Sequence, residues 1–590
     1  MRAGIRPGDY RPSAFSIMPI SIRFVLPALW TALVAPGLLP GQAAAPVPRK
    51  YIGPPTVAEI TAGDLMTRVY KFADDSMMGR QVGTPYNDMG TAYIESEVRR
   101  LGLQPAGDNG TFFQKVPLFT RVLDSASTIA VDGATFTAGT DFTAGANGFT
   151  KDVANATPVF VGAWLDTTRN IPVDSARGRV LVFVPGGLAP GTDIGKFVAS
   201  NGYNQWLAMR AVAAANVVVI GEALSPNALR NAFQSTTTNY LQDWVPLTLN
   251  VTRAVGEALF GAPATSWTHR MAGKPITTSV RFVDTPKPGR NVVAMLPGTD
   301  PALRHQYVAI GAHNDHVGTR AQGPVDHDSV RAFMQVVRPQ GADSDPRPAT
   351  AEELVRVKAI IDSLRAISAP RPDSIYNGAD DDASGSMTVL EVAEQFARGR
   401  EKPKRSILFV WHTGEEAGLW GANYFTARPT VPRDSIVAQI NLDMVGRGGA
   451  DDVTGEDLEG KLLRGGEGYV QLIGSRRLST EMGDLVEAVN AEKQLGLRFD
   501  YSMDANGHPQ NIYCRSDHYE YARYGIPVTF MSTGGHADYH QVTDEPQYLD
   551  YPRMAQIGRL VFESALRIGN LPHRLKVDKP KPDPKGSCVQ

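Results

Sequence analysis

Cysteine is scarce in this chain: its 590 residues include only Cys514 and Cys588. Two cysteines exclude a disulfide framework of the kind that holds small secreted domains together. They leave two possibilities open, a single bridge that ties the C-terminal tail to the body of the protein, or two free thiols. In either case the fold must be stabilised mainly by burial of its apolar residues, which are 42 % of the sequence.

A large charge of either sign is also absent. The formal net charge is −2 at pH 7 and the pI is about 6.6. This balance provides no electrostatic basis for binding nucleic acid or an anionic membrane, so we expect neither as a partner. After the first fifty residues no apolar run approaches the ~20 residues that span a membrane. The length exceeds what one hydrophobic core supports, so we expect two or three domains.

Residues 1–45 have the pattern of a secretory signal peptide. Arginines between Arg2 and Arg23 precede an apolar run from Phe24 to Pro40, and small residues follow. The run is shorter than the ~20 residues of a spanning helix and contains prolines, which favours a cleaved signal over a retained membrane anchor. We therefore expect a secreted or periplasmic protein with no stable membrane association after cleavage.

The remaining chain divides by its pattern of apolar residues. Residues 56–105 show helical periodicity, whereas 122–285 consist of short strands rich in Val, Thr and Phe with glycine between them. From 286 to 572 buried strands alternate with helices, and residues 319–374, rich in Asp, Pro and Gly with one helix, interrupt that alternation. Residues 573–590 form a Lys- and Pro-rich tail that we expect to be disordered.

The alternation in residues 286–572 predicts an α/β fold. The predicted strands are Asn291–Leu296, Tyr307–Ala312, Ser406–Trp411, Ile436–Leu442 and Ile526–Met531, and the predicted helices are Glu352–Ile367, Ser384–Arg398, Ala417–Phe425, Thr480–Ala491 and Tyr551–Ile568. Apolar strands separated by helices are typical of a mostly parallel, twisted sheet with helices on both faces.

Side chains that can bind a metal follow most of these strands. They are His313 and Asp315, the run Asp380–Asp382, the pair Glu415 and Glu416, Asp443, and the loop with Tyr539 and His540. Each group alone is a weak signal, because surface loops, helix caps and exposed helix starts look the same. Together they predict a site, since ligands bind at the carboxyl ends of strands in open α/β sheets. Charges beside buried strands are costly unless a cation compensates them.

In this order and spacing the motifs resemble the M28 family of co-catalytic zinc peptidases. The resemblance is strongest to secreted bacterial members with an inserted protease-associated domain. It implies that 286–572 is the zinc-peptidase domain, that 46–121 is its N-terminal helical part, and that 122–285 is a β-rich, protease-associated-like insertion. The chain departs from the family in two places: the segment 319–374 is longer than usual, and the protease-associated region is degenerate.

The resemblance also implies two zinc ions and assigns their ligands. Asp381 would bridge both ions, with His313 and Asp443 completing one site, and Glu416 and His540 the other. Mixed imidazole and carboxylate ligation suits zinc. A cis peptide bond between Asp381 and Asp382 is expected on the same ground.

Further roles follow from the same resemblance. Glu415 would be the general base, Tyr539 would stabilise the oxyanion, and Asp315 would hydrogen-bond His313 and set its tautomer. Arg515 and Asp517 match a segment on the substrate side. His316 matches no ligand position.

These matches predict an exported di-zinc exopeptidase that acts on peptides, with removal of N-terminal residues as the leading interpretation. A carboxypeptidase, which would need an Arg-rich pocket, and a glutaminyl cyclase, which would need one zinc, are alternatives on the same scaffold. A non-catalytic binding protein is disfavoured because all five ligand positions and Glu415 are present.

Overall fold

The computed structural model describes residues 48–145, 152–189, 200–219 and 246–584, together with 192, 197, 221, 223–225, 229, 232–233, 236–238, 586 and 588–590. The predicted signal peptide lies outside the described residues. No helix within these residues combines the length and the apolar character needed to cross a membrane.

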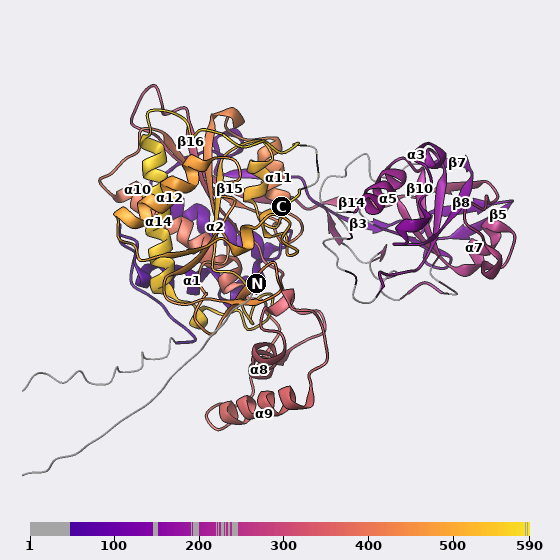
Figure 1. Cartoon of the computed structure of the whole chain (residues 1–590), viewed down its shortest axis with the longest axis horizontal. Helices are drawn as coiled ribbons and strands as arrows, with labels where there is room; N and C mark the ends of the chain where they lie inside the picture. The colour runs from indigo at the N-terminus through magenta and orange to yellow at the C-terminus, as the bar shows by residue number, and fades with distance from the viewer. Residues whose placement is uncertain are drawn as a thin grey trace, which may run out of the picture. The chain divides into compact units, whose positions relative to one another are not determined.

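Residues from both sides of the 122–285 region build a nine-stranded sheet in the described part of the chain (Figure 1). Its strands are β1 (Gln104–Pro105), β2 (Phe113–Val116), β15 (Gly289–Leu296), β16 (Tyr307–His313), β19 (Ser406–His412), β20 (Ile436–Leu442), β23 (Tyr469–Ile473), β24 (Arg498–Asp500) and β25 (Val528–Ser532). The order is β1-β15-β19-β16-β20-β25-β23-β24, and β2 pairs with β15. The five predicted strands are all present, each with ends within two residues of the prediction.

The sheet is mixed, although its centre is parallel as predicted. The strands β19, β16, β20 and β25 run parallel to one another. On the two sides, β15 pairs antiparallel with β19, and β23 pairs antiparallel with β25. All three parallel pairs of the centre place their carboxyl ends at one edge, and this edge carries the site described below.

Helices cover both faces of the sheet because alternate side chains of each strand point to opposite faces. Phe409 of β19 lies 6.3 Å, between ring centres, from Phe396. Its neighbour Val410 packs instead in the cluster that contains Phe425 and Tyr521. The helices on the first face include α10 (Gly385–Arg398) and α14 (Tyr551–Asn570). Two further helices, α1 (Ala62–Phe72) and α12 (Thr480–Glu492), pack against them. The second face is covered by α11 (Trp420–Ala427) and α13 (His518–Ala522).

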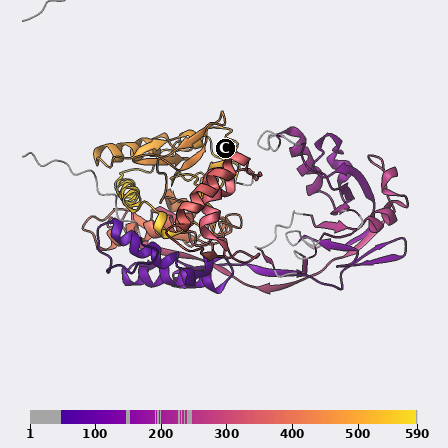
Figure 2. The same ribbon diagram turned by 90° about the horizontal axis from the view of Figure 1, so that it is seen from below.

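The region predicted as a β-rich insertion has sheets of its own, coloured violet to magenta in Figures 1 and 2. A five-stranded sheet contains β6 (Phe142–Ala144), β8 (Pro158–Ala163), β9 (Val180–Val184), β10 (Ala215–Val219) and β12 (Thr248–Val251). A separate buried cluster, with Leu123, Phe142 and Val280 among its members, fills this region. Its identity as a protease-associated domain stays a prediction.

The segment 319–374 contains two helices where the sequence predicted one. The predicted helix is α9 (Ala351–Arg365), and it packs on α8 (His327–Val337) around Val337 and Val357 (Figure 1). The stretches rich in Asp, Pro and Gly on both sides of α8 led the sequence analysis to miss this helix. Asp326 caps it by accepting a hydrogen bond from the backbone of Ser329.

The tail is docked rather than disordered, at least in its described residues. Cys588 forms a disulfide with Cys514, with the two Cα atoms 5.8 Å apart. Gln590 is buried, and its side-chain oxygen accepts a hydrogen bond of 2.8 Å from the backbone of Tyr513. Composition predicted disorder because it does not reveal whether Cys514 and Cys588 are bridged.

Candidate metal centre

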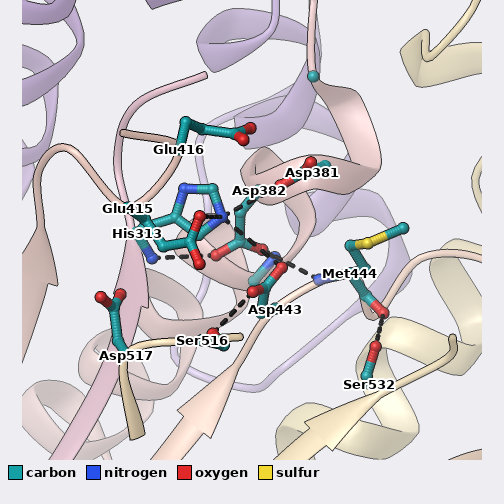
Figure 3. Close-up of polar contacts among 12 residues, drawn as sticks. His313, Asp381, Asp382, Glu415, Glu416, Asp443, Met444, Ser516, Asp517 and Ser532 are labelled. Carbon is teal, nitrogen blue, oxygen red and sulfur yellow. Dashed lines mark hydrogen bonds and ion pairs between the residues drawn. The ribbon is translucent and has the colours of Figure 1, made fainter. Parts of the chain in front are cut away.

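Polar side chains from three strand ends and two loops meet at the carboxyl edge of the sheet (Figure 3). His313 is the last residue of β16, Asp443 follows β20, and Glu415 lies in the loop after β19. Asp381 precedes α10, and His540 lies in the loop after β25. The structure therefore brings together all five residues that the resemblance predicted as metal ligands, with Glu415 beside them.

Asp381 lies between two groups of ligands. Its Oδ1 is 3.1 Å from Nε2 of His313, and its Oδ2 is 2.9 Å from Nε2 of His540. A carboxylate placed this way can bind one cation with each oxygen, as the predicted bridge requires. The peptide bond from Asp381 to Asp382 is cis.

The first half of the centre consists of His313, Asp443 and Oδ1 of Asp381. Nε2 of His313 is 3.6 Å from Oδ1 of Asp443. The other oxygen of Asp443 accepts a hydrogen bond of 2.7 Å from Ser516 (Figure 3). The hydroxyl oxygen of Ser516 in turn accepts a hydrogen bond of 3.0 Å from Asn441. This chain of bonds leaves Oδ1 of Asp443 as the oxygen free to bind a cation.

His313 forms a hydrogen bond with the backbone oxygen of Asp315, and this bond sets the tautomer of its ring. Nδ1 of His313 is 3.1 Å from the backbone oxygen of Asp315 and 3.8 Å from its carboxylate. The backbone oxygen can only accept, so Nδ1 carries the proton and Nε2 faces the centre with its lone pair. The carboxylate of Asp315 instead accepts a hydrogen bond of 3.2 Å from the backbone of Glu415. Burial raises the pKa of Asp315 to about 7.

The second half consists of Glu416, His540 and Oδ2 of Asp381. Nε2 of His540 is 2.9 Å from Oε2 of Glu416. The other oxygen of Glu416 is 2.6 Å from Nδ1 of His316, which is buried beside it. The sequence assigned no role to His316, yet this contact fixes which oxygen of Glu416 remains for a cation. His316 lies close enough to Asp381, Glu416 and His540 to be a candidate fourth ligand itself.

Asp382 also lies within ligand distance of His313 and Asp443, but its oxygens are already used. One accepts a hydrogen bond from the backbone of His313, and the other accepts from the backbones of Gly385 and Met444. Asp382 thus holds the backbone around the centre, whereas the two oxygens of Asp381 face the two imidazoles.

The donors fit a cation better than they fit one another. Nε2 of His313 and Nε2 of His540 are buried and form no hydrogen bond of acceptable geometry, although carboxylate oxygens lie near both. Burial disfavours a charged imidazole at His540, yet the carboxylates of Glu416 and Asp381 outweigh it and raise the pKa to about 11. An excess of buried carboxylate that draws protons onto imidazoles is an arrangement that divalent cations neutralise.

Glu415 points away from Glu416, and the two adjacent carboxylates serve different parts of the centre (Figure 3). Oε2 of Glu415 is 4.0 Å from Nε2 of His313. Burial, with the negative charges of Asp443 and Glu416 nearby, raises the pKa of Glu415 well above its usual range. A carboxyl group beside a cation site can accept a proton from a water and donate it again.

A pocket opens onto the centre. It is lined by Gln340, Asp343, Asp381, Glu415, Glu416, Asp443, Met444, Thr454, Gly455, Gln471, Met503, Gln510, Ile512, Arg515, Ser516, Phe530, Ser532, Gly534, Gly535 and Tyr539. The predicted Arg515 and Tyr539 are among them, and Arg515 donates a hydrogen bond of 3.3 Å to the Tyr539 hydroxyl.

Asp517, which the sequence placed on the substrate side, is fully buried and does not line this pocket. It lies 3.1 Å from Nδ1 of His412. The sequence singled out the right segment but missed Ser516, the residue between the two named ones, which holds Asp443. It also missed Asp544, which accepts hydrogen bonds from the backbones of Asp380 and Asp381. A carboxylate from a distant loop leaves no local pattern.

Two clusters of imidazoles and carboxylates, joined by Asp381 and with Glu415 beside them, form a candidate site for divalent cations. The sequence model described as "Peptidase family M28" matches residues 291–565. Over these residues, just under half of the chain, the sequence is similar to the peptidases of family M28.

Named relatives are similar over shorter stretches. A "Probable leucine aminopeptidase" of Trichophyton verrucosum is 27 % identical over 38 % of this chain and 56 % of the relative. A "Probable zinc metalloprotease" of Pyrenophora tritici-repentis is 46 % identical over 13 % of this chain and 17 % of the relative. The chain thus matches little more than half of the length of these relatives, or less.

Solved structures with a similar trace are more distant in sequence. A zinc aminopeptidase from Bacillus subtilis is 16 % identical, with a TM-score of 0.43, over 90 % of this chain and all of that chain. The glutaminyl cyclase of Porphyromonas gingivalis is 18 % identical, with a TM-score of 0.30, over 48 % of this chain and 78 % of that chain.

Proposed function

We propose that this protein is an exported di-zinc aminopeptidase that removes N-terminal residues from peptides. One zinc would be held by His313, Asp443 and Asp381, and the other by Glu416, His540 and Asp381. When bound, the two ions supply an activated water and polarise the carbonyl of the bond to be cleaved.

The state of Arg515 is the observation that carries the choice of the amino end. Among the described residues that line the pocket, Arg515 is the only basic one. Both of its terminal nitrogens donate to the carboxylate of Asp343, at 3.1 and 2.9 Å. A carboxypeptidase needs an arginine that is free to bind the terminal carboxylate. Here that charge is already paired with Asp343, so Arg515 is not free to bind a terminal carboxylate.

The side chains around the carbonyl have separate tasks in this proposal. Glu415 accepts a proton from the attacking water and delivers it to the leaving amine. Tyr539 donates its hydroxyl proton toward the developing oxyanion, and Arg515 holds that hydroxyl in place. His313 keeps its proton on Nδ1, so that Nε2 is available to the cation.

Export rests on the basic start and apolar run of residues 1–45 and on the bridge between Cys514 and Cys588. Disulfides persist in oxidising compartments, so the bridge supports a periplasmic or secreted location.

The direction of trimming can be tested with one peptide in three forms: free, acetylated at its N-terminus, and amidated at its C-terminus. Each is incubated with the zinc-loaded protein, and products are read by mass spectrometry. We expect loss of the N-terminal residue from the free and the amidated peptide, and no loss from the acetylated one. Loss of a C-terminal residue from the acetylated peptide would instead identify a carboxypeptidase.

A further inference from the structure

A turn of the long segment 319–374 is built into the wall of the pocket. The turn Gly341–Asp343 follows α8, and the backbone of Ala342 donates a hydrogen bond of 3.1 Å to the backbone oxygen of Tyr539. Gly341 has φ +58, and a Cβ at this position would lie 2.5 Å from the same oxygen. The approach is therefore closer than any other residue would permit.

The same turn is also tied to two further segments of the chain through Gln340. Gln340 is almost fully buried, and its amide nitrogen donates a hydrogen bond of 2.8 Å to Glu456. Its amide oxygen accepts one of 3.1 Å from Gln510. These contacts fix the position of the turn, and with it the position of Asp343.

Asp343 is the residue through which the turn acts on the pocket. Its two oxygens accept from two nitrogens of Arg515, and one of those nitrogens also donates to the Tyr539 hydroxyl. A two-point contact between carboxylate and guanidinium fixes orientation as well as charge. The side chains of Arg515 and Asp343 are 37 % and 26 % exposed, so a substrate can reach the pair.

We propose that Asp343 is a specificity-determining residue that excludes carboxylates from the pocket by occupying Arg515, and that it also positions Arg515 beside Tyr539. The substrate class is therefore peptides whose groups near Arg515 are uncharged. Substrates with a carboxylate there, either an acidic side chain or the free end of a dipeptide, are discriminated against. This inference rests on the proposed function, which makes peptides the substrates, but its test measures binding and does not require turnover.

The test compares the binding of matched acid and amide probes. Two pairs are used, Leu-Gly with Leu-Gly amide, and Glu-anilide with Gln-anilide. Their dissociation constants are measured by calorimetry on the zinc-loaded chain that carries Glu415→Gln, so that probes are not consumed. Asp343→Asn is then added to this background. The matched control is Asp362→Asn, which removes an exposed aspartate of α9 that pairs only with Lys358 in the described structure.

We expect Asp343→Asn to raise the affinity for the acid relative to the amide by about tenfold or more in at least one pair, since one charge-assisted hydrogen bond provides discrimination of this size. Asp362→Asn should leave both ratios unchanged. Equal ratios in both pairs before and after Asp343→Asn would overturn the proposal.

A second variant, Arg515→Met, keeps the proposal testable if Asp343→Asn does not fold. Arg515→Met leaves Asp343 without its partner, so the acid-to-amide affinity ratio should shift in the opposite direction. A shift in the same direction, or none, would also overturn the proposal. Failure of the proposed function would look different: the zinc-loaded wild-type chain would release no N-terminal residue, while the binding ratios would still report on Asp343.

Discussion

The two halves of the metal centre differ in how they are held. In the first half, His313 and Asp443 stand at the ends of neighbouring strands, and the His313 side chain is 1 % exposed. In the second half, Glu416 and His540 come from loops, the His540 side chain is 25 % exposed, and its backbone has φ +54. The sheet itself positions the first half, whereas the second depends on loop packing, including that of the turn Gly341–Asp343. Asp381 connects the two.

The largest effect should come from the residue that the halves share. Asp381→Asn removes the charge that faces both imidazoles, so it should lower the affinity for both zinc ions. The loss of zinc affinity should exceed the ~10- to 100-fold caused by removing a residue that only hydrogen-bonds a ligand. Activity should disappear. Elemental analysis after dialysis measures the bound zinc, with Asp362→Asn as the control. Full retention of one ion would show that Asp381 serves only one half.

Changes confined to one half should affect one ion. Glu416→Gln should weaken the second zinc and Asp443→Asn the first, because each removes a charged ligand from its own group. Excess zinc should restore part of the activity of Glu416→Gln. Zinc titrations of the two variants should therefore show one strong and one weak site each. Two weak sites in either variant would mean that the halves are not independent.

The sequence predicted the first half more completely than the second. Strand ends such as those of β16 and β20 follow from apolar runs, and a residue directly after such a run must lie at the sheet edge. The resemblance then assigned the loop ligands Glu416 and His540. The direction of each strand was harder to predict, because an apolar run does not show whether the strand is parallel or antiparallel to the strand beside it. The antiparallel pairs at the two sides of the sheet were therefore not predicted.

The supporting contacts were the least predictable part. Ser516, His316 and Asp544 act on ligands that are far away in the chain, so no local spacing identifies them. For Asp315 the sequence named the residue but not the atom, and the backbone oxygen rather than the carboxylate binds His313. Such choices depend on distances of a few tenths of an ångström.

Intermediate effects should follow from removing these supporting partners. Ser516→Ala should weaken the first zinc, and His316→Ala the second, by about 10- to 100-fold each. Competition with a fluorescent zinc chelator would measure both affinities. A larger loss for His316→Ala than for Glu416→Gln would make His316 a ligand in its own right. No loss for Ser516→Ala would remove Ser516 from the centre.

The smallest effect on metal binding should come from the disulfide. Cys514 lies two residues before Ser516, so the bridge to Cys588 holds the segment that supports Asp443. Replacing both cysteines by serine should lower the free energy of unfolding by about 2–4 kcal/mol. It should weaken the first zinc less than Ser516→Ala does and leave the second unchanged. Urea unfolding and the same zinc competition would measure these changes, and a weakened second zinc would contradict the expected link.

The most direct test of the whole account is the zinc content and the turnover of Glu415→Gln. If Glu415 carries protons and binds no metal, the variant should keep two zinc ions per chain. Its kcat should fall by at least ~10²–10⁴-fold with little change in KM. Loss of one zinc from Glu415→Gln, with both retained in Glu416→Gln, would reverse the assigned roles. Unchanged activity in both variants would show that the reaction takes place elsewhere.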